Sequence, residues 1–222
     1  MKYVLIFLLT AAITVQAGVF GSEKVAAGTN SPEKDFDSVN GSITVGENAH
    51  VDNLDTVNGS IKVGNNAIVG KVETVNGSIK FHNGVTADHA ETVNGSIKLG
   101  ENCLIKGHAE TVNGSVTAEE GCLVEGKMET VNGKITATGA QVGGNIETVN
   151  GNIKLDNGTV VDGDVIIEKS TGWFNSNKKV PEVYIGEDVV VKGDLVFKKK
   201  VKLYVADSAQ VGEIIGDDIT DM

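Results

Sequence analysis

The stretch Thr56-Val57-Asn58-Gly59-Ser60-Ile61-Lys62-Val63 recurs in close copies along most of this chain. The triplet Val-Asn-Gly begins at Val39, Val57, Val75, Val93, Val112, Val131 and Val149, so successive copies lie 18, 18, 18, 19, 19 and 18 residues apart. A unit this short cannot bury a core of its own and has to stack on its neighbours. The repeat therefore predicts a stack of like coils.

Within one copy, apolar residues alternate with polar ones in short pairs. Ile61 and Val63 form one pair, and Ala67 and Val69 form the next pair six residues later. Alternation with a period of two is typical of short strands with one buried face. Six residues per side and 18 per coil predict an all-β, single-stranded parallel β-helix, a three-sided solenoid.

The Asn-Gly step of each copy is expected at a corner, where a residue with positive φ is needed and Gly adopts it at little cost. Asn-Gly alone would favour a hairpin, but whole 18-residue units in register argue against one. Stacked coils would place the asparagines in a single ladder of side-chain amides, by analogy with cross-β ladders. The members of this structural ladder are Asn40, Asn58, Asn76, Asn94, Asn113, Asn132 and Asn150.

The boundaries follow from where the period holds. Residues 1–17 have the charge, apolar run and small-residue ending of a secretory signal peptide, and residues 18–35 are expected to be a flexible leader. The β-helix is predicted over 36–211, with a polar loop at 168–180 and the same helix continuing after it. The extra residues of the longer copies are assigned to corners near Lys106-Gly107 and Glu125-Gly126, and residues 212–222 to a tail or cap.

Composition excludes some partners. The formal net charge is -11 and all 19 basic residues are Lys, so the chain lacks the guanidinium fork and the positive charge that bind nucleic acid. No apolar run after the signal peptide reaches the length of a membrane span. We expect an exported protein of the periplasm or the cell surface, with no transmembrane segment after cleavage of the signal.

The two cysteines, Cys103 and Cys122, are one repeat step apart and should lie one above the other at the strand spacing. Two interpretations stay open. The pair forms a disulfide, which an exported location permits, or the two thiols are small apolar members of an inward ladder.

Three columns of polar residues are candidate binding sites. Carboxylates precede each Thr-Val-Asn-Gly, at Asp55, Glu73, Glu91, Glu110, Glu129 and Glu147, but the pattern lacks the Asp and Gly of a calcium β-roll and is interpreted as a solvated edge. Lysines at Lys62, Lys80, Lys98 and Lys154 are assigned to solubility. The threonine column lacks the Thr-x-Thr spacing of ice-binding faces.

No catalytic residue, metal site or cofactor is predicted. His50, His82, His89 and His108 are interpreted as exposed loop residues that share no repeat offset and have no nucleophile beside them. Trp173 and Phe174 in the polar loop are the candidate ligand contact, because an exposed aromatic ring can stack on a sugar.

Two family resemblances follow from the motifs. Thr-Val-Asn-Gly-Ser-Ile resembles the repeats of bacterial exported domains classed as putative adhesins of unknown function. The stretch from Ile185-Gly186-Glu187 to Val191-Lys192-Gly193-Asp194-Leu195 resembles the coils of bactofilins, polymer-forming proteins with a right-handed three-sided β-helix. The second resemblance implies a right-handed coil, and neither family supplies catalytic residues.

The expected function is that of a non-enzymatic cell-envelope structural or adhesion module. The alternatives are a bactofilin-like scaffold that polymerises end to end, and a glycan-binding protein that uses Trp173. The expected partners are accordingly the chain itself or components of the cell envelope.

Overall fold

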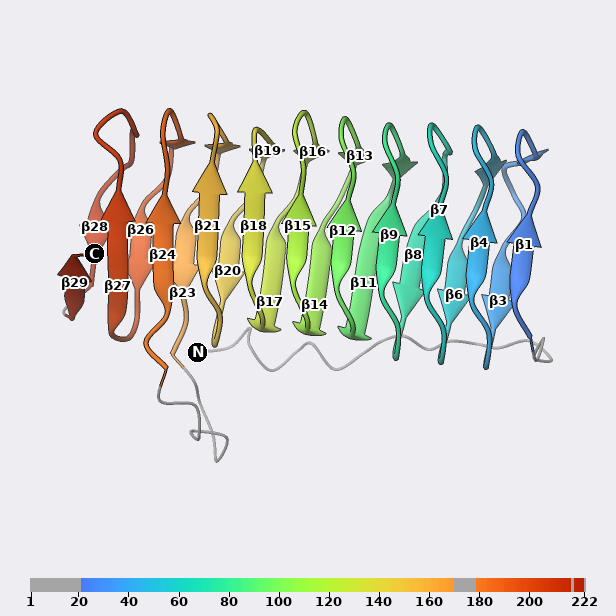
Figure 1. The fold of residues 1–222 in the computed structure, drawn as a ribbon, viewed down its shortest axis with the longest axis horizontal. Helices are drawn as coiled ribbons and strands as arrows, with labels where there is room; N and C mark the ends of the chain where they lie inside the picture. Colours follow the sequence, from blue (N-terminus) through green and yellow to red (C-terminus); the bar gives the residue numbers. More distant parts are fainter. Residues whose placement is uncertain (1–20, 170–178, 217, 222) are drawn as a thin grey trace.

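The computed structural model describes residues 21–169, 179–216 and 218–221. Within these ranges the chain contains β-strands and turns and no helix. About ten coils stack into a straight rod, with β1 at one end and β29 at the other (Figure 1). The predicted all-β solenoid is confirmed.

Three sheets run along the rod, one on each side, and each coil contributes a strand to each sheet or a bridge in its place. The front sheet of Figure 1 contains β1 (Glu23–Val25), β4 (Ile43–Val45), β7 (Ile61–Val63), β9 (Ile79–Phe81), β12 (Ile97–Leu99), β15 (Val116–Ala118), β18 (Ile135–Thr138), β21 (Ile153–Asp156), β24 (Glu182–Ile185), β27 (Val201–Val205) and β29 (Ile219–Asp221).

The narrow sheet follows the front sheet in each coil and has strands of two residues. It contains β2 (Asn30–Ser31), β5 (His50–Val51), β10 (Thr86–Ala87), β13 (Leu104–Ile105), β16 (Leu123–Val124), β19 (Gln141–Val142), β22 (Val160–Val161) and β25 (Val190–Val191). Ile68 connects β5 to β10 through single bridges on both sides.

The back sheet completes the coil. It contains β3 (Phe36–Ser38), β6 (Leu54–Thr56), β8 (Lys71–Thr74), β11 (His89–Asn94), β14 (Ala109–Asn113), β17 (Met128–Asn132), β20 (Ile146–Thr148), β23 (Val165–Ile167), β26 (Leu195–Phe197) and β28 (Ile214–Ile215).

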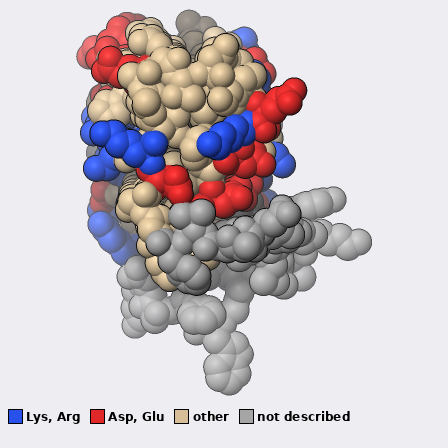
Figure 2. Space-filling view, turned by 90° about the vertical axis from the view of Figure 1, so that its right-hand side faces the viewer, with Lys and Arg blue, Asp and Glu red and all other residues tan. Residues whose placement is uncertain are grey.

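All strand pairs are parallel and join residues one coil apart, for example Ile61 with Ile79 and Ile97 with Val116. The chain rises in the front sheet, passes over the top and descends in the back sheet while it advances from right to left, which is a right-handed path (Figure 1). Seen from the β1 end, an uncharged area covers the upper middle of the rod, and lysine and acidic side chains surround it (Figure 2).

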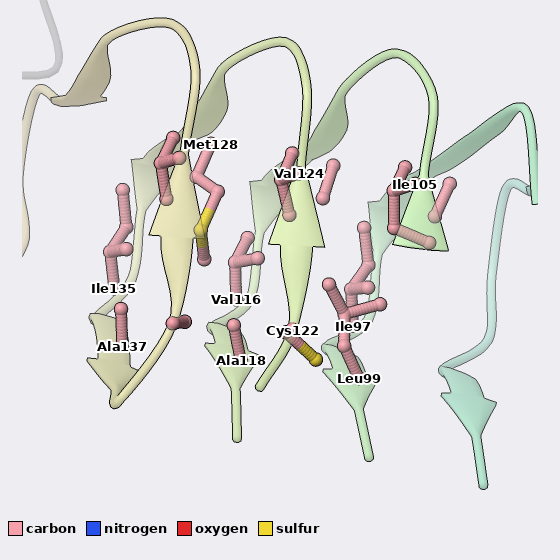
Figure 3. Close-up of a cluster of buried hydrophobic side chains, with 14 of the residues drawn as sticks. Ile97, Leu99, Ile105, Val116, Ala118, Cys122, Val124, Met128, Ile135 and Ala137 are labelled. Atoms are coloured by element: carbon pink, nitrogen blue, oxygen red, sulfur yellow. The ribbon is translucent and has the colours of Figure 1, made fainter. Parts of the chain in front are cut away.

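The core lies between the three sheets and is aliphatic. Ile97, Val116 and Ile135 of the front sheet form one inward column, and Ile105 and Val124 of the narrow sheet form another (Figure 3). These side chains are almost completely buried. Because each column continues from coil to coil, burial that one coil cannot achieve alone is achieved by the stack.

The threonine column faces inward. Thr56, Thr74, Thr92, Thr111 and Thr130 are buried, and each hydroxyl donates to the carbonyl oxygen of the glycine of the preceding Val-Asn-Gly at 2.8 to 2.9 Å. A buried column cannot present an ice-binding face.

The reason predicted for the repeated glycine is wrong. The corners with positive φ lie between the front and narrow sheets, for example at Asn66 and Asn102, and not at Val-Asn-Gly. A Cβ atom on Gly95 would instead meet the backbone oxygen of Gly77 at 1.9 Å. Glycine is required there because successive coils come into close contact.

Two predicted boundaries need correction. The described part of the expected flexible leader, 21–35, forms a first coil, since β1 pairs with β4 and β2 pairs with β5. The pattern was missed because this coil lacks Val-Asn-Gly and buries Val25 as its single core hydrophobic residue. The β-helix does not end at residue 211 either, because β28 and β29 of the expected tail or cap continue the back and front sheets.

The longer corners lie where the sequence predicts them. Ile105 pairs 18 residues from Ala87, whereas Ala109 pairs 19 residues from Ala90, so the extra residue falls between Ile105 and Ala109. After the loop, β24 pairs with β21, so the same helix continues beyond it.

Candidate functional site

The acidic column occupies the outward positions of the back sheet. Its members are in register, one per coil: Asp37, Asp55, Glu73, Glu91, Glu110, Glu129 and Glu147. Neighbouring strands of a sheet lie about 4.8 Å apart, so like charges in such a column repel one another. The column can persist only where cations or protons offset this repulsion.

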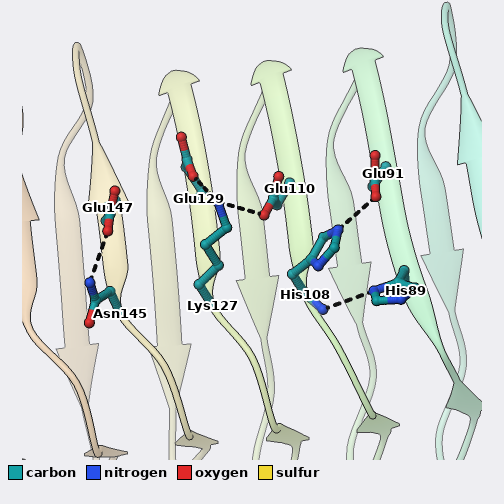
Figure 4. A network of polar contacts seen from close by, with 8 residues as sticks. All are labelled: His89, Glu91, His108, Glu110, Lys127, Glu129, Asn145 and Glu147. Carbon is teal, nitrogen blue, oxygen red and sulfur yellow. Dashed lines mark hydrogen bonds and ion pairs between the residues drawn. The ribbon is translucent and has the colours of Figure 1, made fainter. Parts of the chain in front are cut away.

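A second column lies beside the acidic one, two residues earlier in each coil. It begins with Lys71 and continues with His89, His108, Lys127 and Asn145. Figure 4 shows the last four of these residues. His89 precedes Ala90 and His108 precedes Ala109, and these two alanines pair directly. The strand register therefore places cationic and neutral donors next to the carboxylates.

His108 connects the two columns. Its Nε2 atom lies 2.7 Å from Oε1 of Glu91, and its ring lies 4.3 Å from the ring of His89. The hydrogen bond to Glu91 raises the pKa of His108, and the same bond lowers the pKa of Glu91. Burial and the charge of His108 lower the pKa of His89, so the pKa values of the two neighbouring histidines shift in opposite directions.

Lys127 bridges two carboxylates. Its Nζ atom lies 2.9 Å from Glu110 and 2.7 Å from Glu129 (Figure 4). Burial alone would lower the pKa of Lys127, but these contacts outweigh burial and raise it. Burial raises the pKa of Glu110, whose side chain is 2% exposed, and Lys127 partly offsets that rise. A buried carboxylate is strongly destabilising unless a cation pairs with it, and Lys127 provides that cation for Glu110.

The start of the column has weaker compensation. Burial, followed by repulsion from Glu73, Asp37 and Asp35, raises the pKa of Asp55 from 3.8 to about 7, and Lys71 opposes this rise. Burial and the charge of Glu91 also raise the pKa of Glu73. Asp55 is therefore partly protonated near neutral pH.

The net charge of the acidic column therefore changes with pH. Within the chain His108 contacts Glu91, and Lys127 contacts Glu110 and Glu129. Within the described ranges no group of three or more His, Cys, Asp and Glu residues is arranged to hold a metal ion. The chemistry open to this face is electrostatic contact with a charged partner.

No family model, no curated protein and no solved structure matches this chain.

Comparisons therefore add nothing to the geometry. In the part of the chain that the structure describes, no helix has the length and apolar character needed to cross a membrane.

The seven predicted ladder asparagines form one column. Six hydrogen bonds of 2.9 to 3.0 Å connect them, because each side-chain amide from Asn58 to Asn150 donates to Oδ1 of the asparagine one coil earlier. Lys199 ends the ladder: its Nζ donates to Oδ1 of Asn150 at 3.2 Å and to the carbonyl oxygen of Val149. A cation thus lies at the acceptor end of a row of aligned amides.

The two cysteines are buried free thiols. Cys103 donates to the carbonyl oxygen of His82 at 3.1 Å, and Cys122 donates to that of Gly100 at 2.7 Å. Of the two interpretations, the structure has the inward pair of thiols. Trp173 and Phe174 lie outside the described residues.

The prediction that the histidines share no repeat offset is wrong for two of them. His89 and His108 each lie three residues before the threonine of the next Thr-Val-Asn-Gly, so they do share a repeat offset. The shared offset can be found in the sequence by counting back from Thr92 and Thr111 of the motif. His50 and His82 lie elsewhere, His50 on the narrow sheet and His82 exposed at the end of β9.

Proposed function

We propose that this chain is a non-enzymatic, exported rod of the cell envelope that acts as a structural or adhesion module. The observation that carries the proposal is the parallel stack, in which the front sheet continues over eleven strands and the asparagine ladder and the acidic column each recur over seven coils. A stack of this kind holds its surface groups at a constant spacing of about 4.8 Å. The signal-peptide pattern of residues 1–17 supports the exported location.

Such a rod suits contact with a polymer or a surface that is itself periodic. The asparagine ladder and the acidic column each present one polar group per coil, so many weak contacts add up along the rod. Exposed single contacts of this kind are worth little by themselves. Binding to an extended partner would therefore depend on rod length more than on any one residue.

The first experiment tests the location. The chain with a C-terminal tag is expressed in a bacterium, the cells are fractionated, and the N-terminus of the recovered protein is sequenced. We expect a mature protein that begins at Gly18 in the periplasmic or surface fraction. A full-length protein confined to the cytosol would overturn the exported location.

The second experiment tests adhesion. Purified rods are sedimented with washed cell-wall material, next to a variant in which Glu73 and Glu129 are changed to Gln. Binding by the parent at low salt that the variant reduces supports an adhesive acidic face. If the parent does not sediment with the material, the structural role remains and the adhesive role is excluded for that partner.

A self-polymerising scaffold is the second candidate, and the last coil favours it. In the described chain β28 and β29 each pair with only one strand, and Ile214 and Ile215 are 47% and 46% exposed. Open strand edges can pair with another chain. Light scattering of the chain with and without residues 212–222 tests this: polymers that form in both cases, or in neither, argue against end-to-end stacking through β28.

A further inference from the structure

From Ile68 to Val190 the outward column of the narrow sheet carries no charged side chain; Asn30 and His50 precede this part of the column and Gln210 follows it. The front sheet presents lysines together with threonines and tyrosines, and the back sheet presents carboxylates as far as Glu147, whereas this part of the narrow sheet presents apolar side chains, one threonine and one glutamine. We call this column the apolar stripe; it consists of Ile68, Thr86, Leu104, Leu123, Gln141, Val160 and Val190, which lie in register one coil apart.

The stripe is accessible. Ile68 is 42% exposed, and Leu104, Leu123, Val160 and Val190 are partly exposed although each points away from the core. Scattered single apolar residues need no explanation on a surface, but five of them in one column, interrupted only by Thr86 and Gln141, mark a contact area. Its neighbours on the front-sheet side are the residues of the tight corners, which include asparagines and glycines and also the exposed Glu101, Glu120 and Asp188.

A charged border runs beside the stripe, two residues further along each coil. Its members, in coil order, are Asp88, Lys106, Glu125, Gly143, Asp162 and Lys192. Lys106 lies 2.9 Å from Asp88 and Lys192 lies 2.8 Å from Asp162, so the border contains two ion pairs, with Glu125 and Gly143 between them. Its charges in order are negative, positive, negative, none, negative and positive.

This order is complementary to its own reverse. A twofold axis in the plane of the sheet, crossing the rod between the coils of Glu125 and Gly143, brings the same border of two antiparallel rods together. Coil counting then places Lys106 opposite Asp162 of the second copy and Asp88 opposite Lys192 of the second copy. The two remaining positions pair Glu125 with Gly143, so no like charges face each other. Self-complementarity of this kind is what a twofold interface requires.

We propose that the narrow sheet is an interface on which a second copy of this chain docks antiparallel, with apolar stripes in contact and charged borders paired. Seven coils at about 4.8 Å give a stripe of roughly 30 Å, and a side about 15 Å wide gives roughly 450 Å² per copy. That is below the area of a standard stable interface. The dimer is therefore expected to be weak and to depend on protein concentration.

Sedimentation velocity of the full chain over a wide concentration range provides the test. The parent is expected to shift from monomer to a lateral dimer as concentration rises. Lys106→Glu places two acidic residues opposite each other and should weaken the dimer by about tenfold or more. Asp162→Lys should do the same, and the double variant should recover the dimer because opposite charges face each other again.

Two further variants locate the interface. Lys62→Glu changes net charge by the same amount on the front sheet and is expected to leave the dimer intact. Leu123→Lys on the stripe should abolish the dimer while the rod stays folded by circular dichroism, because the side chain points outward. Removing residues 212–222 should also leave this dimer intact, which separates it from end-to-end stacking.

The proposal is overturned if the parent stays monomeric at every concentration. It is equally overturned if Lys62→Glu weakens the dimer as much as Lys106→Glu, or if the double variant fails to restore it.

Discussion

At the scale of single residues, Asp55 makes the stability of this chain depend on pH. Burial and neighbouring carboxylates raise its pKa from 3.8 to about 7, so the folded chain binds this proton more tightly than the unfolded chain. By linkage, the contribution to the free energy of unfolding is fully present below pH 3.8 and is lost as the pH rises toward about 7.

The substitution Asp55→Asn removes the ionisable group, so the loss of stability with rising pH disappears. We expect the variant to be more stable than the parent by about 1–2 kcal/mol near pH 8, a value reduced from the full shift because the side chain is partly exposed to solvent. Near pH 3, below the ordinary pKa of 3.8, Asp55 is protonated in both the folded and the unfolded chain, so the difference should be close to zero. Urea unfolding followed by circular dichroism measures both. Asp207→Asn, at an exposed site, is the control. A difference that is the same at both pH values would contradict this account.

A second residue-scale prediction compares two buried threonines. The hydroxyl of Thr130 donates to the carbonyl oxygen of Gly114 at 2.8 Å. The equivalent hydroxyl of Thr148 is buried without a hydrogen-bond partner among the described residues. Thr130→Val should cost about 1–2 kcal/mol, because it leaves a buried carbonyl unpaired, whereas Thr148→Val should be neutral or stabilising. Thermal unfolding of the two variants decides between them, and equal losses would refute the difference.

At the scale of the elements, the corner between the back and front sheets depends on glycine more than on asparagine. Gly95→Ala would place a Cβ atom 1.9 Å from the backbone oxygen of Gly77, and a backbone atom cannot move away without breaking the stack. We expect a loss of more than about 3 kcal/mol, or failure to fold. Asn94→Ala removes two exposed amide hydrogen bonds and should cost only about 1 kcal/mol.

The two corner variants are compared by yield of soluble protein and by thermal unfolding, with Ser96→Ala as a control at the next position. If Asn94→Ala proved the more damaging of the two, the amide ladder and not the close contact between coils would be the dominant restraint.

The sequence pattern predicts some features of the strands and corners and not others. Strand positions and register were predictable, because two-residue alternation and an 18-residue period leave few other arrangements. The contacts of His108 with Glu91 and His89 were not predicted, because the histidines were not aligned to the motif. The role of the repeated glycine could not be predicted either, since positive φ and close backbone contact favour the same residue.

At the scale of the whole molecule, stability should follow the number of intact coils. Deleting residues 75–92 joins Thr74 to Val93, which are successive residues of the same repeat, so each strand still meets an equivalent partner. We expect a folded rod that is shorter by about 4.8 Å and still unfolds cooperatively.

Deleting only residues 75–83 removes half a coil and turns the inward positions outward, so this variant should not fold. Circular dichroism and small-angle scattering distinguish the two deletions. A full-coil deletion that is as damaging as the half-coil deletion would argue against a stack of equivalent units.

The sequence by itself determined the coil length, the three sides, the parallel register and the residue types of each column, because a period along the chain becomes a period in space once the coils stack. Only the tertiary structure decided which neighbouring columns touch, where the first and last coils lie, and that Cys103 and Cys122 remain thiols. Contacts between columns depend on side-chain direction and corner length, and neither is written in the repeat. For the same reason, the self-complementary order of charges in the charged border can be recognised only once the coils are stacked.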